Sequence, residues 1–421
     1  MTCAVLSIGT ELTRGELTNS NASYLGSELT GLGFEVVEHD TVDDNRERIV
    51  EALERLAAKA RVVVCTGGLG PTTDDMTTEA VAGALGVRLA RDEVSLELIR
   101  RRLEKFGRSL SASNSKQADF PEGADILPNP VGTAPGFGVR VGECVAYFLP
   151  GVPREMKKMF EEQVVPRIRA LASNNHHQLR LRTFGLPESV VGEKLEGVEQ
   201  DFPGTIIGYR AHFPEIEVKV LSKAASNSAA RDLCERATAE VRARLGAYVF
   251  GDADDTFAGV VGRALRTRGW TLAIAESCTG GLVGHMLTRE PGASDFLLLD
   301  AVTYANSAKS RILAVEEDTL RWHGAVSSEV ASAMAIGARR ISGADVALAL
   351  TGVAGPAGGS EQKPVGTVFI AIAKPDGTTD VKHRVFPGER TQIQTLASYA
   401  GLQLVRELCA TRGAERASEH A

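Results

Sequence analysis

Short apolar runs alternate with segments of helical periodicity through most of the chain. "CAVLSIG" (3–9) and "RVVVCTGG" (61–68) are continuous apolar runs that end in glycine. Between them, "NRERIVEALERLAAKA" (45–60) carries apolar residues three and four positions apart. Buried, β-branched strands that alternate with helices are typical of a parallel sheet covered on both faces. The pattern therefore predicts an α/β fold.

The pattern changes twice and divides the chain into three predicted domains. Residues 1–170 form the first α/β domain, and 255–415 return to strand–helix alternation as a second one. Between them, 176–252 predict a small α+β domain in which a strand, a helix, two strands and a helix precede a last strand, "YVFG". "RALASNNHHQLR" (169–180) predicts a linker, with the adjacent His176 and His177 as solvated loop residues.

Composition and charge exclude several classes of protein. A chain of 421 residues is too long for one ordinary core. A nucleic-acid-binding surface needs a basic stripe, whereas the net charge is −7 and the one basic cluster, "LIRRRLEKFGR" (98–108), is typical of the wet face of a helix. We therefore expect no nucleic-acid partner.

The cysteines and the apolar runs indicate where the protein works. The six cysteines are scattered, without a CxxC pair, so neither a zinc site nor a disulfide framework is expected. The start, "MTCAVLSIG", lacks the basic and long apolar regions of a signal peptide, and no apolar run approaches the roughly 18 residues of a membrane span. We expect a cytoplasmic protein with no membrane partner.

Candidate chemistry appears at "AIAESCTGG" (273–281). A predicted strand delivers Glu276, Ser277 and Cys278 to the C-terminal edge of a sheet, where ligands of open α/β sheets bind. The two glycines that follow let the backbone approach a ligand, and the next helix would direct free N–H groups at it. The same residues are also explained as a glycine-rich turn capped by Ser277 or Thr279.

Two further stretches favour a catalytic interpretation. "TYANSAK" (303–309) places Tyr304, Asn306 and Lys309 after another strand, and a long Gly-Pro loop lies within "LTGVAGPAGGSEQKPVGTV" (350–368). Together they supply a hydroxyl nucleophile, an amine base, a phenol and an anion-binding loop, without a histidine, which is typical of Ser–Lys chemistry. As the base, Lys309 needs a pKa depressed by roughly three units from about 10.4.

With "HGAVS" and "FPGER", these stretches closely resemble the C-terminal domain of the CinA (competence/damage-inducible protein A) family. The resemblance implies a cofactor-independent deamidase that hydrolyses nicotinamide mononucleotide to nicotinate mononucleotide and ammonia. It also implies that Ser277 is the nucleophile and Lys309 its general base, while Tyr304 relays or orients the proton. The implied substrate-binding residues are Thr279, Gly280, Gly281, Asn306, Thr351, Gly355 and Arg390. The family further implies a homodimer.

Two residues bear on this assignment. Cys278, with Glu276 and Lys309, would complete a Glu–Lys–Cys amidase triad, but adjacent strand residues face opposite sides, so only Ser277 or Cys278 can face the cleft. The resemblance favours Ser277. Asp300 stands where many relatives carry glycine, and a carboxylate beside Lys309 would keep it protonated. We therefore expect Asp300 to point away from Lys309.

The N-terminal segment carries a second strand, glycine turn and helix. "VVVCTGGLGPTTDDMT" (62–77) predicts a phosphate-binding loop, and the carboxylates around it could hold a divalent metal against a pyrophosphate. Asp74 or Asp75 could instead cap the following helix.

With "NSKQA", "NPVGTAPGF" and "LPGVPREM", residues 1–170 resemble the molybdopterin-binding fold in its CinA form. The resemblance implies metal-dependent hydrolysis of ADP-ribose to AMP and ribose 5-phosphate, with a divalent metal ion of unknown identity at Asp44 and Asp75. The implied ADP-ribose site comprises Glu11, Asn21, Gly67, Gly68 and Asp74. The alternative is a non-catalytic nucleotide- or pterin-binding module. The middle segment corresponds to a KH-like domain, but it lacks a GxxG loop with basic flanks, so RNA binding is not expected.

Overall fold

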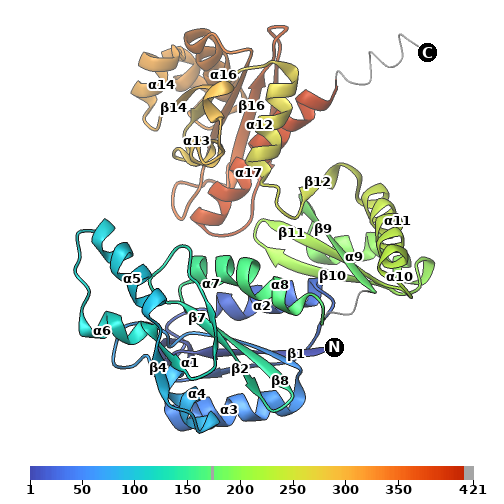
Figure 1. The fold of residues 1–421 in the computed structure, drawn as a ribbon. Coiled ribbons are helices and arrows are strands. Elements are labelled where there is room, and N and C mark those ends of the chain that lie inside the picture. Colours follow the sequence, from blue (N-terminus) through green and yellow to red (C-terminus); the bar gives the residue numbers. More distant parts are fainter. Residues whose placement is uncertain (172–174, 412–421) are drawn as a thin grey trace. The chain divides into compact units, whose positions relative to one another are not determined.

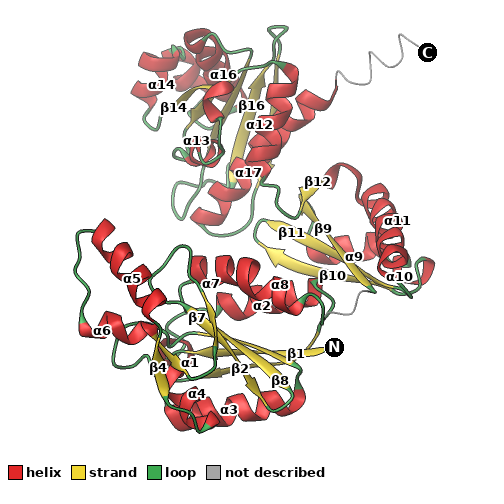
Figure 2. Cartoon of the chain, viewed as in Figure 1, coloured by secondary structure: helices red, strands yellow, loops and turns green. Residues whose placement is uncertain are grey.

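The computed structural model describes residues 1–171 and 175–411. They form a six-stranded, a four-stranded and a five-stranded sheet, with one two-stranded ribbon, and Figures 1 and 2 show each sheet with its helices. By their contacts they divide into two compact units. The first holds residues 1–171, 175–178, 199–206 and 220–239, and the second holds 179–198, 207–219 and 240–411.

The N-terminal sheet has the order β2-β1-β3-β8-β7-β6. Its strands are β1 (Thr2–Ile8), β2 (Glu35–Val42), β3 (Val62–Thr66), β6 (Asp125–Leu127), β7 (Gly136–Val141) and β8 (Cys144–Leu149). The first four in the sheet are parallel, and β7 pairs antiparallel with both of its neighbours, β8 and β6. Successive β3 residues point to opposite faces, and each face has its own apolar core.

Helices cover both faces of this sheet. In Figure 1, α3 (Arg46–Lys59) and α4 (Thr77–Leu85) lie on one side, and α2 (Ser20–Gly31) and α7 (Pro153–Met159) on the other. The side chain of Asn19 caps α2 and that of Asn45 caps α3. The smaller elements of this part are α1 (Thr10–Thr13), β4 (Leu89–Arg91), α5 (Glu93–Lys105), α6 (Ala112–Ser115), β5 (Asp119–Pro121) and α8 (Val165–Ile168). The predicted basic helix face belongs to α5, where Arg100 and Arg101 pair with Glu97.

The middle sheet has the order β10-β11-β9-β12. Its elements are β9 (His176–Phe184), α9 (Glu188–Leu195), α10 (Val198–Asp201), β10 (Thr205–His212), β11 (Glu215–Lys223), α11 (Asn227–Leu245) and β12 (Val249–Asp252). The prediction of a linker over 169–180 is wrong at its end, because His176 and His177 open strand β9. The two histidines lack the apolar alternation that marks a strand. The strands that pair with β9 come from later segments of the chain, so the local sequence does not show where β9 begins. Residues 172–174 lie outside the described residues.

The C-terminal sheet has the order β14-β13-β15-β16-β17. Its strands are β13 (Leu272–Glu276), β14 (Leu297–Val302), β15 (Val346–Gly352), β16 (Thr367–Ala373) and β17 (Thr379–Val385). The first three in the sheet are parallel, and β16 and β17 are antiparallel additions. The α/β class predicted for both outer segments is confirmed.

Helices also cover both faces of this second sheet. On one face α12 (Phe257–Arg268), α13 (Leu282–Thr288) and α17 (Arg390–Thr411) enclose an apolar core with Ile274 and Leu348. On the other, α14 (Asn306–Leu313) and α16 (Ser328–Ser342) pack over Ala273 and Ala275, with α15 (Glu317–His323) beside α16. The alanines on this face let the helices approach closely. In the described residues no helix is long and apolar enough to cross a membrane.

Candidate functional site

Ser277 and Lys309 meet at the C-terminal edge of the C-terminal sheet. Ser277 directly follows β13, and Lys309 lies in the second turn of α14. The Nζ atom of Lys309 is 2.9 Å from Ser277 Oγ, 2.7 Å from the carbonyl oxygen of Thr303 and 3.3 Å from that of Tyr304. Lys309 is 1% exposed, and burial lowers its pKa, as a general base requires.

The turn after Ser277 is held by the residue before it. Glu276 is fully buried, and its carboxylate accepts hydrogen bonds from the N–H groups of Gly281 and Gly284, each at 2.9 Å. Gly280 and Gly281 have φ of 67° and 96°, a left-handed conformation that favours glycine. Both glycines therefore shape the connection from β13 to α13.

The main-chain N–H groups of residues 277–281, which follow the strand and could bind an oxyanion, are largely engaged within the fold. The N–H of Ser277 donates to Leu350, that of Gly280 to Ser277, and that of Gly281 to Glu276. The N–H groups of Cys278 and Thr279 contact the thiol of Cys278, which is a weak acceptor. Of the main-chain N–H groups of Ser277 to Gly281, these two have the weakest acceptor and are the ones that a ligand oxygen could recruit.

Cys278 points into the apolar core. It is 5% exposed and belongs to the cluster that contains Ile274 and Leu350. Burial raises the pKa of its thiol to about 12, so the thiolate needed of a nucleophile is disfavoured. The Glu–Lys–Cys alternative is therefore unsupported, because Glu276 caps α13 and Lys309 contacts the serine.

Asp300 lies beside Glu276. It pairs in register with Ile274 of β13, two residues before Glu276 and therefore on the same face of the sheet. A Cβ atom on Gly284 would overlap the Oδ2 atom of Asp300, so the glycine makes room for the carboxyl group. Besides burial, the negative charge of Glu276 raises the pKa of Asp300, and Lys309 is not among the groups that shift it. The expectation that Asp300 points away from Lys309 agrees with these contacts.

Tyr304 is placed differently from the expected relay. Its side chain is 62% exposed, and its hydroxyl accepts a hydrogen bond from Arg390 at 3.0 Å. The backbone carbonyl of Tyr304, and not its phenol, contacts Lys309. Arg390 also donates to the carbonyl of Gly355 at 2.7 Å, so it ties the Gly-Pro loop to Tyr304.

The other predicted substrate-binding residues differ in availability. Thr279 is 3% exposed, and its hydroxyl has no hydrogen-bond partner in the described part of the chain. Thr351 is 1% exposed and donates to the carbonyl of Ala325 at 2.7 Å, which anchors the "HGAVS" segment. Asn306 is exposed at the start of α14. Sequence reasoning missed Gln394, whose amide donates to the carbonyl of Cys278 at 2.8 Å.

A cleft of about 450 Å³ lies at the C-terminal ends of the strands in the N-terminal sheet. The predicted residues that line it are Glu11, Asp44, Gly67, Gly68, Asp74 and Asp75. Gln117 and Glu155 also line it, although only their motifs, "NSKQA" and "LPGVPREM", drew attention in the sequence. Asn21 instead lies behind the loops, where its amide donates to Thr66 Oγ1 and to the carbonyl of Gly151.

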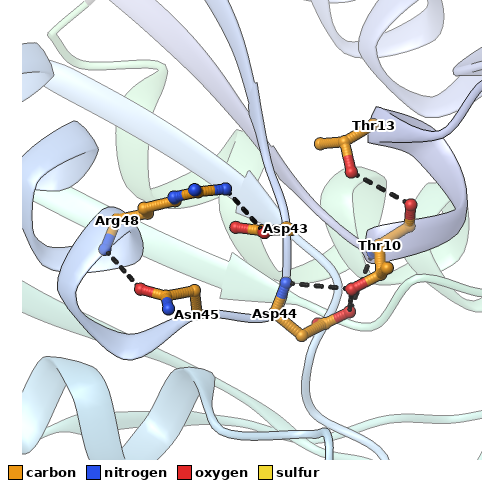
Figure 3. A network of polar contacts seen from close by, with 6 residues as sticks. All are labelled: Thr10, Thr13, Asp43, Asp44, Asn45 and Arg48. Atoms are coloured by element: carbon orange, nitrogen blue, oxygen red, sulfur yellow. Dashed lines mark hydrogen bonds and ion pairs between the residues drawn. The ribbon is translucent and has the colours of Figure 1, made fainter.

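Both predicted metal-site carboxylates accept hydrogen bonds from threonines. The Oδ2 atom of Asp44 accepts from the N–H and hydroxyl of Thr10 at 2.8 and 2.9 Å. Figure 3 shows this pair beside Asp43, which pairs with Arg48. The Oδ2 atom of Asp75 accepts from the N–H and hydroxyl of Thr72 at 2.8 and 2.6 Å.

The cleft does not contain a ready-made metal centre. No three histidine, cysteine, aspartate or glutamate side chains of residues 1–171 and 175–411 are grouped so as to hold an ion. Mg²⁺ commonly binds through one or two carboxylates together with substrate phosphates and water. Asp44 and Asp75 fit a cation that arrives with a phosphate ligand better than one resident in the protein.

The site and fold therefore define a protein of three α/β and α+β modules with a Ser–Lys pair and a separate acidic cleft. Family comparison assigns each module. The probable molybdopterin-binding domain matches residues 4–170, the damage-inducible protein CinA KH domain matches 178–251, and the CinA C-terminal domain matches 254–409.

Relatives match along the whole chain. A CinA-like protein of Geotalea uraniireducens is 43% identical over 421 residues, which is 99% of each chain. A CinA-like protein of Geobacter metallireducens is 42% identical over 410 residues, 96% of this chain and 98% of the relative. The chain belongs to the CinA family.

Solved structures match shorter parts. The protein CinA of Thermoplasma acidophilum is 35% identical, with a TM-score of 0.37, over 40% of this chain and 97% of its own. The competence/damage-inducible protein of Agrobacterium tumefaciens is 37% identical, with a TM-score of 0.35, over 37% of this chain and 96% of its own. The family assignment rests on the sequence relatives.

Proposed function

We propose that the C-terminal domain is an amidohydrolase that deamidates nicotinamide mononucleotide by Ser–Lys catalysis. The observation that carries this proposal is the contact between Lys309 and Ser277 at 2.9 Å in a buried setting. A free lysine is neutral in only about one molecule in two thousand at pH 7, so a base role depends on a lowered pKa. Burial lowers the pKa of Lys309 in the required direction.

The partners of Lys309 also orient its lone pair. A neutral amine has two hydrogens and one lone pair. The carbonyl oxygens of Thr303 and Tyr304 can only accept hydrogen bonds, so they take the two hydrogens. The lone pair is then left for the third partner, the hydroxyl of Ser277, which can donate its proton. This arrangement prepares Ser277 for attack.

The reaction proceeds in two balanced halves. Ser277 Oγ bonds to the carboxamide carbon while its proton passes to Lys309 Nζ, and the carbon–nitrogen bond then breaks as Nζ returns the proton to the departing ammonia. Lys309 next takes a proton from water as the water oxygen bonds to the ester carbon, and Nζ then returns that proton to Ser277 Oγ as the ester bond breaks and nicotinate mononucleotide leaves. The N–H groups of Cys278 and Thr279 are the candidate donors to the developing oxyanion.

The test is direct. Purified protein incubated with nicotinamide mononucleotide should release ammonia and nicotinate mononucleotide in equal amounts, with and without chelator. Release of neither product would exclude the proposal. The six cysteines are free and buried, which suits the reducing cytoplasm expected for such an enzyme. The homodimer stays a prediction, checked by sedimentation.

A second activity, hydrolysis of ADP-ribose to AMP and ribose 5-phosphate, is proposed for the N-terminal cleft. The observation that favours it is the charge of the cleft, whose lining carries Glu11, Asp44, Asp74, Asp75 and Glu155 but no lysine or arginine among the described residues. Carboxylates alone repel a pyrophosphate, so a divalent cation must come between them. Chelator-sensitive formation of AMP would support hydrolysis. Binding of ADP-ribose without turnover would leave the alternative of a nucleotide-binding module.

A further inference from the structure

A pair of carboxyl groups lies directly behind the turn that carries Ser277. Glu276 is fully buried at the end of β13, and Asp300 of the neighbouring edge strand β14 lies beside it on the same face of the sheet. Both lie on the face of the sheet that α13 covers, where Gly284 makes room for Asp300. The Oδ1 atom of Asp300 is buried and has no hydrogen-bond partner in the part of the chain that the structure describes.

Two ionised carboxylates in such a place repel each other strongly, so one of them keeps a proton. Glu276 already accepts two main-chain hydrogen bonds, from Gly281 and Gly284, so each of its two oxygens has an N–H donor. The Oδ1 atom of Asp300 has no such donor among the residues that the structure describes. The proton therefore resides on Asp300, which donates it in the hydrogen bond to Glu276.

We propose that Asp300 is a positioning residue of the Ser277 site: as a neutral acid it shares its proton with Glu276 and holds that carboxylate against the N–H groups that begin α13. Because Glu276 immediately precedes Ser277, its position sets one end of the turn, and the bonded glycines set the other. This inference rests on the proposed deamidase function, because positioning is measured by the rate at that site.

The surrounding groups allow Asp300 to lose its proton within an accessible pH range. Burial, the charge of Glu276 and the hydrogen bond with it raise the pKa of Asp300 to about 7. From β13 the group facing Asp300 is Glu276, and α13 presents glycine N–H groups, while its His285 is exposed. Neither Cys278 nor Lys309 is among the groups that shift the pKa of Asp300. Ionisation of Asp300 should therefore loosen the turn.

The experiment compares the wild type with Asp300→Asn, whose amide cannot ionise but can still donate to Glu276. Hydrolysis of nicotinamide mononucleotide is measured from pH 6 to pH 8.5. The ratio of kcat for Asp300→Asn to kcat for the wild type should rise at least about fivefold over this range, because a required proton is lost only from the wild type. A constant ratio would overturn the proposal.

A second measurement does not depend on activity. Amide hydrogen exchange of a peptide covering residues 277–284 should become faster in the wild type than in Asp300→Asn as the pH rises from 6 to 8.5. Equal exchange in both proteins overturns the positioning role. A wild type that releases no ammonia at any pH instead overturns the proposed deamidase function, and the exchange result then decides alone whether Asp300 positions the turn. Asp300→Ser, a smaller neutral donor, replaces the asparagine variant if that variant does not fold. Asp295→Asn is the matched control, because Asp295 is an exposed acid in the preceding segment that pairs with Arg266. It should match the wild type in the pH dependence of kcat and in the rate of hydrogen exchange.

Discussion

Lys309 and Ser277 are joined by a buried contact of 2.9 Å between Nζ and Oγ, although they come from different elements of the C-terminal domain. The neighbouring Cys278 faces the opposite side of the sheet, into the apolar core. The fold thus separates the hydroxyl that contacts an amine base from the thiol that does not. This separation determines which substitutions should abolish hydrolysis and which should only affect packing.

Ser277→Ala should abolish ammonia release, and Cys278→Ala should retain most of it. Removal of a nucleophile costs several orders of magnitude in rate. Cys278 contributes packing, so its loss should lower stability by about 1 kcal/mol and leave the chemistry in place. Ammonia assays on both variants, with thermal unfolding as a control for folding, check this. An inactive Cys278→Ala that folds normally would contradict the Ser–Lys assignment.

Lys309→Arg should be as inactive as Lys309→Met. Arginine keeps the positive charge but cannot lose its proton near neutral pH, so it cannot act as a base. In the wild type, hydrolysis should rise with pH as the buried amine deprotonates, and its lowered pKa places this rise below the range of an ordinary lysine. The pH profile of kcat/KM checks both points. Substantial activity of the arginine variant would make Lys309 an electrostatic anchor.

The stability of the wild type relative to Asp300→Asn should fall as the pH rises from about 4 to 7. The pKa of Asp300 is raised to about 7 in the folded state, so between its unfolded and folded values the folded protein binds the extra proton. The stability linked to that proton is full below the unfolded pKa and is lost as the pH passes through 7. The loss is at most about 4 kcal/mol. The melting temperatures of the two proteins, measured from pH 4 to pH 8, check this. A difference in melting temperature that stays constant over this range would contradict the prediction.

An ion pair of the middle sheet is joined by a hydrogen bond to the C-terminal domain, within one compact unit. Arg182 of β9 pairs with Glu215 of β11, which is 3% exposed and also accepts a hydrogen bond from Tyr399 of α17 at 2.7 Å. Arg182→Met leaves a buried carboxylate without its cation and should cost about 3 kcal/mol. Tyr399→Phe removes one hydrogen bond to a charge and should cost about 2 kcal/mol.

Unfolding of these variants in denaturant measures the two costs. Arg210→Met, at an exposed arginine of β10, is the matched control and should stay within about 0.5 kcal/mol of the wild type. An Arg182→Met variant as stable as this control would show that the folded protein does not need Arg182 as a partner for Glu215.

The strands that carry the chemistry could be predicted from sequence because their runs are short, buried and bounded by glycine. β13 and β3 are examples, with every residue buried. Strand β17 was missed because it is a polar edge strand, "TDVKHRV", with one neighbour and little buried surface. Edge strands need few apolar residues, so their pattern resembles that of a loop.

Residue roles that depend on distant partners were beyond the sequence pattern. The family resemblance implied that the phenol of Tyr304 lies at the dyad, whereas its hydroxyl accepts a hydrogen bond from Arg390, at the start of α17. Likewise, the sequence showed Asp300 as an acid near a base, and only the packing of Gly284 against it pairs it with Glu276. A strand's residue order fixes the face on which a side chain lies, but not the neighbour it meets there.

The two proposed activities should be separable. Asp75 lines the N-terminal cleft, and its carboxylate accepts hydrogen bonds from Thr72. If it also holds a divalent cation against the substrate's phosphates, Asp75→Asn removes one negative ligand and should reduce AMP formation from ADP-ribose at least about tenfold.

The deamidase scheme uses no metal, because Lys309 supplies the base, so ammonia release should be unchanged both in this variant and under chelator. Ser277→Ala should show the reverse pattern. Full ADP-ribose turnover by Asp75→Asn would reduce Asp75 to a residue that orders the turn through Thr72, and loss of ammonia release under chelator in a folded protein would show that the deamidase depends on a metal.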